Sequence, residues 1–170
     1  VDEVQDLFEP DYLQKRLYER SPESAFGAVF RLEGVVADVE VLPAFVDAWT
    51  AVAAEFDYAP SYNNLGTAYL RAESYAAAIR AYKEAVALDG ANAMHHFNLG
   101  LALQKAGQNE GAVVAFGRAI ELQPGYGKAY LSKALSHQRM GDISAARQAL
   151  QQLLAVEPDN STAARLLARM

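Results

Sequence analysis

The sequence repeats itself every 34 residues, and this period limits the fold more than any other feature. Shifting the sequence by 34 positions aligns residues 59–92, 93–126 and 127–160 without a gap. Small, aromatic and apolar residues then share columns, as in Gly66, Gly100 and Ala134, in Ala78, Ala112 and Ala146, and in Tyr82, Phe116 and Leu150. A period of 20–50 residues is typical of arrays in which each unit buries its apolar face against its neighbours. The sequence therefore predicts an array of at least three units.

Each unit shows the pattern of two helices. In the first unit, apolar residues recur at helical spacing from Tyr62 to Tyr69 and again from Tyr75 to Leu88, with a break near Glu73-Ser74. Equivalent breaks in the later units fall at Gly107 and Gly141, while Pro124 and Pro158 close the second and third units. The small side chains in the Gly66 and Ala78 columns would let the two helices of a unit approach closely. We therefore expect an all-α fold built from helical hairpins.

This pattern resembles the tetratricopeptide repeat family, whose unit has the same length and the same order of aromatic, Leu-Gly, Tyr, Ala, aromatic, Ala and Pro positions. Asn64-Leu65-Gly66 and Asn98-Leu99-Gly100 match the commonest triplet of that family. The resemblance implies a right-handed solenoid of helical hairpins. The third unit departs from the pattern, because Lys133 stands where Leu is expected and His137 where an aromatic residue is expected. The Lys133 stem can lie along the hairpin surface and keep its ammonium group in water.

The two ends of the chain fit the repeat less well. The segment 25–58 carries a second-helix pattern but a poor first-helix pattern, so 1–58 is either a degenerate repeat with flanking helix or a separate helical cap. At the other end, 161–170 is expected to form a capping helix with a polar outer face, as solenoids require. Asn160-Ser161-Thr162 also fits a glycosylation sequon, but we interpret it as the start of this helix.

Composition narrows the function classes. The net charge of −6 disfavours a general nucleic-acid binder, since phosphate binding relies on clustered Lys and Arg. The chain has no cysteine, which excludes disulfides and thiolate metal sites but leaves the compartment open. No apolar run approaches a membrane span, so we expect no membrane insertion. Because the chain begins at Val1 without a methionine, we interpret it as a fragment or processed form.

No catalytic, cofactor or metal motif is present in the sequence, so we do not expect an enzyme. The three histidines, His95, His96 and His137, have no chelating spacing, and the columns of His96 and His137 indicate packing roles. The carboxylates are scattered along the chain and form no paired set.

In the family that this chain resembles, the first helix of each hairpin lines a concave groove that binds extended peptides or helices. Carried onto this chain, the groove positions on the first unit are Asn63, Thr67, Leu70 and Arg71. Those on the second unit are Met94, Phe97, Asn98, Leu101, Gln104 and Lys105. Those on the third unit are Lys128, Leu131, Leu135, Gln138 and Arg139. Four of these form an expected apolar floor, namely Phe97, Leu101, Leu131 and Leu135.

Arg71, Lys105 and Arg139 recur every 34 residues and are expected to form a basic ladder along the groove. Such a ladder suits a partner with an acidic segment or a free carboxylate. The alternative is that each cation interacts with the C-terminus of its own helix. A subfamily that clamps chaperone tails uses a fuller set of Lys, Asn and Arg residues, of which only Asn98 and Lys128 match here.

The leading functional hypothesis is a protein-interaction module, a scaffold, adaptor or assembly factor that binds a protein or peptide. Two alternatives remain at this point. In the first, the chain is a regulatory or substrate-recruiting arm of a larger enzyme. In the second, it is a self-assembling scaffold, and its groove or its 1–58 segment docks on another copy.

Overall fold

The computed structural model describes residues 59–170, and these residues form seven α-helices with no strand. The predictions made for 1–58 lie outside the described residues. Six of the helices have 13 or 14 residues, and the last has eight. In chain order they are α5 (Ala59–Arg71), α6 (Tyr75–Leu88), α7 (Ala93–Lys105), α8 (Asn109–Leu122), α9 (Gly127–Arg139), α10 (Ile143–Val156) and α11 (Ser161–Ala168).

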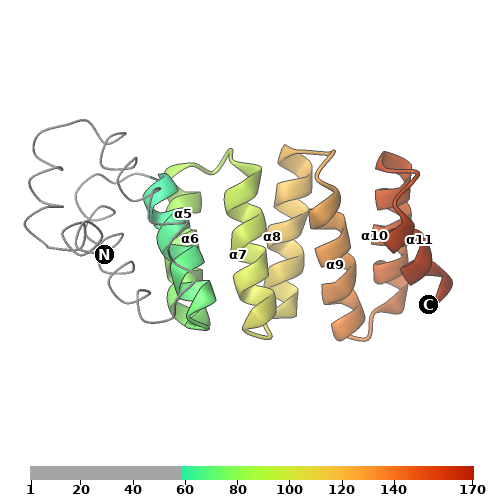
Figure 1. The fold of residues 1–170 in the computed structure, drawn as a ribbon, viewed down its shortest axis with the longest axis horizontal. Helices are drawn as coiled ribbons and strands as arrows, with labels where there is room; N and C mark the ends of the chain where they lie inside the picture. Colours follow the sequence, from blue (N-terminus) through green and yellow to red (C-terminus); the bar gives the residue numbers. More distant parts are fainter. Residues whose placement is uncertain (1–58) are drawn as a thin grey trace, which may run out of the picture.

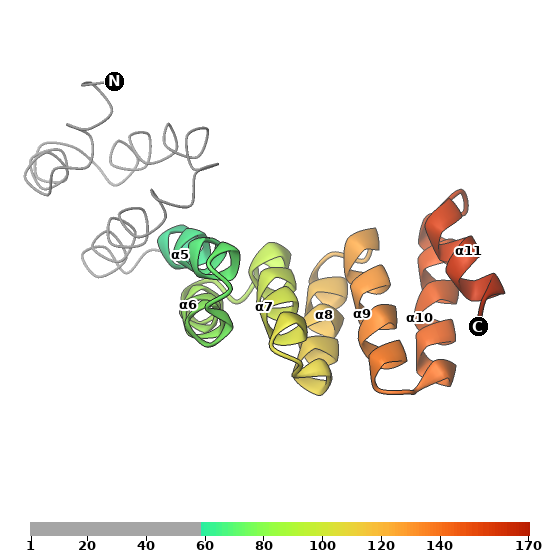
Figure 2. The same cartoon turned by 60° about the horizontal axis from the view of Figure 1, so that its bottom comes forward.

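The helices pair into hairpins that stack in a row (Figure 1). Each helix packs against the next one along the chain, and the first helices α5, α7 and α9 also contact one another in that order. Figure 2 shows the hairpins following one another from α5 and α6 to α11 at the C-terminal end. The expectation of an all-α solenoid of helical hairpins is confirmed for the part of the chain that the structure describes.

Two glycines set the distance between the helices of the first two hairpins. A Cβ atom added to Gly66 would lie 2.7 Å from the Tyr82 ring, and one added to Gly100 would lie 2.6 Å from the Phe116 ring. These contacts are shorter than any side chain tolerates without movement. The glycines therefore allow an aromatic ring of the second helix to lie directly against the backbone of the first.

The turn inside each hairpin uses a left-handed backbone conformation. Gly107 and Gly141 have φ angles of 79° and 80°, which glycine adopts without a steric cost. In the first hairpin the equivalent residue is Glu73, with a φ of 55°. A glutamate in this region is uncommon and strained, so the first turn is held by the packing of α5 and α6 on either side.

Aromatic rings fill the interface between the second and third hairpins. The ring centroid of Phe97 lies 5.6 Å from that of Phe116 and 4.8 Å from that of Tyr126. Phe116 is fully buried. This cluster joins α7, α8 and the loop before α9 into one core.

A second core lies at the C-terminal end, where α11 packs on α10. Ala163 of α11 is fully buried against a cluster that contains Leu150 and Leu153. Asn160 caps α11, because its Oδ1 accepts a hydrogen bond from the Ala163 amide at 2.9 Å. The interpretation of Asn160-Ser161-Thr162 as a helix start is confirmed.

Candidate binding surface on the first helices

We call the surface formed by α5, α7 and α9 the first-helix face. The residues predicted for partner binding all lie on these three helices, but the structure divides them into three groups by exposure. The exposed ones are Arg71, Met94, Lys105, Lys128, Gln138 and Arg139. The half-buried ones are Thr67, Leu70, Asn98, Leu101, Leu131 and Leu135. The buried ones are Asn63, Phe97 and Gln104.

The position of Phe97 corrects the expected apolar floor. Its side chain is only 9 % exposed and packs between Phe116 and Tyr126. Aromatic rings of this size stabilise a core by their large buried area, and little of this ring is left for a partner. Of the four residues of the expected floor, Leu101, Leu131 and Leu135 are half-buried and keep part of their surface exposed.

Asn63 is buried because it links α5 to α7. Its Oδ1 accepts a hydrogen bond from Asn98 Nδ2 at 2.8 Å and lies 3.3 Å from His95 Nδ1. An amide oxygen only accepts, so His95 must donate from Nδ1. The three side chains form a polar contact between the first two hairpins.

Gln104 makes the matching contact between α7 and α9. Its Nε2 donates to Ser136 Oγ at 2.8 Å and to the Ser132 carbonyl at 3.1 Å. Gln104 is 8 % exposed and Ser136 is fully buried. Gln104 therefore positions the two helices relative to each other, and its amide nitrogen is used in these two contacts.

The Thr67 hydroxyl group is hydrogen-bonded within the first hairpin. Its Oγ1 donates to the Asn63 carbonyl at 3.0 Å and lies 3.0 Å from the Tyr82 hydroxyl. Since the single Thr67 proton is used on the carbonyl, Tyr82 donates to Thr67. Burial raises the pKa of Tyr82, and the Thr67 hydrogen bond and the nearby Arg71 charge oppose that shift only in part.

The role of His95 was not predicted from the sequence. This side chain is 1 % exposed, and its Nε2 has no hydrogen-bond partner within residues 59–170. The Asp89 carboxylate lies 3.9 Å from that nitrogen. Burial lowers the pKa of His95, the Asp89 charge opposes this shift, and His96 adds to it. The only sequence signal was the column that His95 shares with the small residues Ser61 and Ala129.

The basic ladder is exposed. Arg71, Lys105 and Arg139 are the last residues of α5, α7 and α9. None of them takes part in an ion pair within the described residues. Arg139 Nη1 approaches the Gln104 carbonyl at 3.4 Å, so this guanidinium group lies at the C-terminus of the neighbouring helix α7. Each cation therefore lies at a helix C-terminus, where a positive charge is favourable, and its charge also remains accessible to solvent.

Other classes of site receive no support in residues 59–170. This part of the chain contains no group of three or more His, Asp or Glu side chains that could hold a metal ion. None of its helices is both long and apolar enough to cross a membrane.

Comparison with protein families finds one type of match. Two models described as tetratricopeptide repeat match the chain, one over residues 63–127 and the other over residues 103–170. Comparison with the curated proteins finds no significant match.

Solved structures with the same arrangement include YrrB, described as a TPR protein with an unusual peptide-binding site. It has a TM-score of 0.75 and 20% identity, covering 97% of this chain and 85% of YrrB. The MamA fragment 41-end from Desulfovibrio magneticus RS-1 has a TM-score of 0.74 and 20% identity, covering 93% of this chain and 87% of its own. The second TPR domain of the human RPAP3 protein, in complex with the HSP70 peptide SGPTIEEVD, has a TM-score of 0.61 and 30% identity. That match covers 65% of this chain and 92% of the domain.

Proposed function

Because this chain belongs to the tetratricopeptide repeat family, we propose that it is a protein-interaction module that holds a partner peptide or helix against the first-helix face. The partner that fits best carries an acidic segment. The finer role is that of a scaffold, adaptor or assembly factor, in which the bound segment recruits a larger protein.

One observation carries this proposal. Arg71, Lys105 and Arg139 are exposed, recur at the repeat period and have no carboxylate partner in the described residues. The chain as a whole has a net charge of −6, so three unpaired cations along one edge are a local departure from its overall charge. A row of like charges attracts an extended segment of opposite charge and aligns it along the array.

Apolar contact would come from the half-buried leucines of the same face. Leu101 and Leu131 pack partly against the core and keep part of their surface free. Asn98 already donates to Asn63, which holds its amide in place beside them. A rigid polar group next to partly exposed leucines is the arrangement that orients a bound peptide without a large ordering cost.

Two similar structures support a peptide partner. The second TPR domain of human RPAP3 is in complex with the HSP70 peptide SGPTIEEVD, and the first TPR of Spaghetti is bound to the HSP90 peptide SRMEEVD. Both peptides carry several carboxylates. The subfamily that clamps chaperone tails uses a fuller set of Lys, Asn and Arg residues, and this chain has only Asn98 and Lys128 of that set. We therefore do not expect it to bind a peptide by the same clamp.

The test compares two triple variants of equal net charge. One variant reverses the ladder by Arg71→Glu, Lys105→Glu and Arg139→Glu. The matched control reverses three exposed arginines on the second helices by Arg80→Glu, Arg118→Glu and Arg147→Glu. Each protein serves as bait for partners from the source organism, and the Kd of the captured segment is then measured for all three proteins.

We expect the ladder variant to lose at least about tenfold in affinity at low salt, while the control changes little. The difference should shrink at about 0.5 M salt, where charges are screened within a few Å. Circular dichroism checks that both variants stay folded. If the folded ladder variant binds as tightly as the wild type, the first-helix face is not the site.

A further inference from the structure

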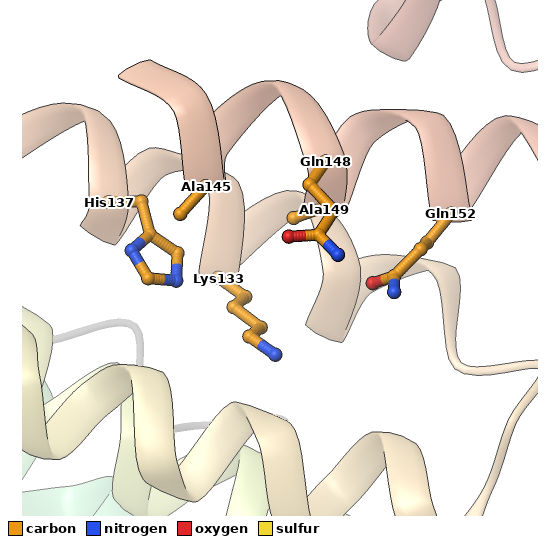
Figure 3. Close-up of a pocket in the computed structure, with 6 residues that line it drawn as sticks. All are labelled: Lys133, His137, Ala145, Gln148, Ala149 and Gln152. Carbon is orange, nitrogen blue, oxygen red and sulfur yellow. The ribbon is translucent and has the colours of Figure 1, made fainter. Parts of the chain in front are cut away.

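The two departures of the third unit from the repeat pattern meet in one pocket. Lys133 and His137 of α9 line it from one side, and Gln148 and Gln152 of α10 line it from the other (Figure 3). Ala145 and Ala149 form its floor, and its volume is about 90 Å³. Since about 10–15 Å³ of such space holds one water molecule, the pocket has room for a group of several heavy atoms.

The pocket is separate from the first-helix face. Residues two positions apart on a helix point about 200° apart, so Lys133 and His137 lie opposite Leu131 and Leu135 on α9. Lys133 and His137 are themselves four positions apart and share one face. A ligand in this pocket would not compete directly with a peptide on the first-helix face.

The equivalent positions in the first two hairpins are apolar and well packed. Leu65 and Leu103 are 6 % and 8 % exposed, and Leu99 and Tyr69 are partly buried against the core cluster that contains Leu103. In the third hairpin these positions carry Lys133 and His137, and a hollow takes the place of the packed side chains. A repeat that replaces two core-facing apolar residues by polar ones loses burial, and a bound ligand would explain that loss.

The charges around the pocket favour an anion. None of the ion pairs within residues 59–170 includes Lys133. Its ammonium group lies over α8, 3.9 Å from the point where a Cβ on Gly117 would stand. The two glutamine amides reach toward the same space in Figure 3 and supply N–H donors. The Asp142 carboxylate lies 3.8 Å from His137 Nδ1, on the helix N-cap rather than among the lining residues.

We propose that this pocket binds a carboxylate group. Lys133 supplies the opposite charge, and Gln148 and Gln152 supply hydrogen bonds to the two oxygens. One cation together with neutral amide donors balances one negative charge, whereas a phosphate dianion would need further cations. The carboxylate belongs either to an acidic side chain of a partner protein or to a small free acid.

The test uses nuclear magnetic resonance of the full chain labelled with ¹⁵N. Two probes are titrated separately, succinate as a small free acid and the blocked tripeptide Ac-Ala-Glu-Ala-NH₂ as an acidic side chain. Sodium chloride at the same ionic strength serves as the reference. We expect the side-chain amide signals of Gln148 and Gln152 to shift with at least one probe and not with chloride. The probe that binds more tightly identifies the source of the carboxylate.

Lys133→Leu restores the residue found at the equivalent position of the first two hairpins, so this variant should fold. It should weaken binding of the probe at least tenfold. The matched control is Lys83→Leu, an exposed lysine of α6 that belongs neither to the pocket nor to the first-helix face, and it should keep the affinity within about twofold. Shifts of equal size with chloride, or unchanged binding by folded Lys133→Leu, would overturn the proposal.

Discussion

At the scale of single residues, Gly66 and Gly100 show how the repeat controls packing. Each lies against the aromatic ring of its own hairpin at a distance that excludes a Cβ atom. Gly117 lies in the interior of α8, and a Cβ added there would meet only the Lys133 ammonium at 3.9 Å. The same residue type therefore has two roles in this chain. Gly100 is required by a close contact, whereas Gly117 is a helical glycine that alanine could replace.

Gly100→Ala should destabilise the protein, although alanine is the better helix former. The added methyl group pushes the Phe116 ring away at a cost of about 1–3 kcal/mol, and only the lower end of this range is as small as the gain of about 1 kcal/mol in helix propensity. Gly117→Ala should instead stabilise by up to about 1 kcal/mol, since only the propensity term applies. Thermal unfolding followed by circular dichroism gives both changes. Equal shifts in the same direction would mean that the α7–α8 contact is more adaptable than the structure indicates.

At the scale of helices, much of the fold was predictable from the sequence because the repeat encodes it directly. The sequence predicted helix breaks at Gly107 and Gly141 because both residues are glycines. The structure places both in the left-handed conformation. The first turn uses Glu73 in the same column, and its break was predicted from the apolar spacing on either side, but its left-handed conformation was not predicted.

The details of the candidate surface were less predictable, because they depend on contacts between helices that are 28 to 35 residues apart. The repeat pattern places Asn63, Phe97 and Gln104 on the first helices, but it does not show which of them the next hairpin covers. Their burial follows from the Asn63–Asn98 and Gln104–Ser136 hydrogen bonds and from the Phe97 ring cluster. The exposure of Arg71, Lys105 and Arg139 agrees with their expected place along the groove.

The contact between α5 and α7 should make stability depend on pH through His95. Its folded pKa is lowered by burial, so below about pH 6.5 the unfolded chain binds a proton that the folded chain resists. The contribution of this residue to stability is therefore present above about pH 6.5 and is lost as the pH falls below it. His95→Ala, which introduces the residue found at position 129, should flatten the dependence of melting temperature on pH between about pH 5 and pH 8.

A non-titrating member of the same contact provides the control for His95. Asn98→Ala removes the 2.8 Å hydrogen bond to Asn63 and should lower stability at every pH without changing the slope. The two variants therefore separate loss of the contact from loss of the titration. An identical pH slope in wild type and His95→Ala would show that another group controls the acid response.

At the scale of the whole molecule, each hairpin of a solenoid packs against the next element, and α11 packs against the last full hairpin of the described residues. The last full hairpin presents Leu150 and Leu153, which are fully buried in the structure. Leu166 and Leu167 of α11 pack against the same cluster, while Arg165 is exposed on the outer side of the helix. An array of this kind needs a terminal element that is apolar inside and polar outside.

Removing residues 161–170 should therefore expose the end of the array and cause self-association. The core cluster around Leu153 would lose the partners that α11 supplies, and an uncovered apolar patch at the end of a repeat array can dock on another copy. Size-exclusion chromatography with light scattering across a concentration series measures the association, and thermal unfolding measures the loss of stability. Leu166→Asp should reproduce part of both effects in a chain of full length, whereas the neighbouring Arg165→Asp should reproduce neither, because Arg165 is exposed. If the truncated chain stays monomeric with an unchanged melting temperature, the last hairpin is stable without a cap, and α11 has another role.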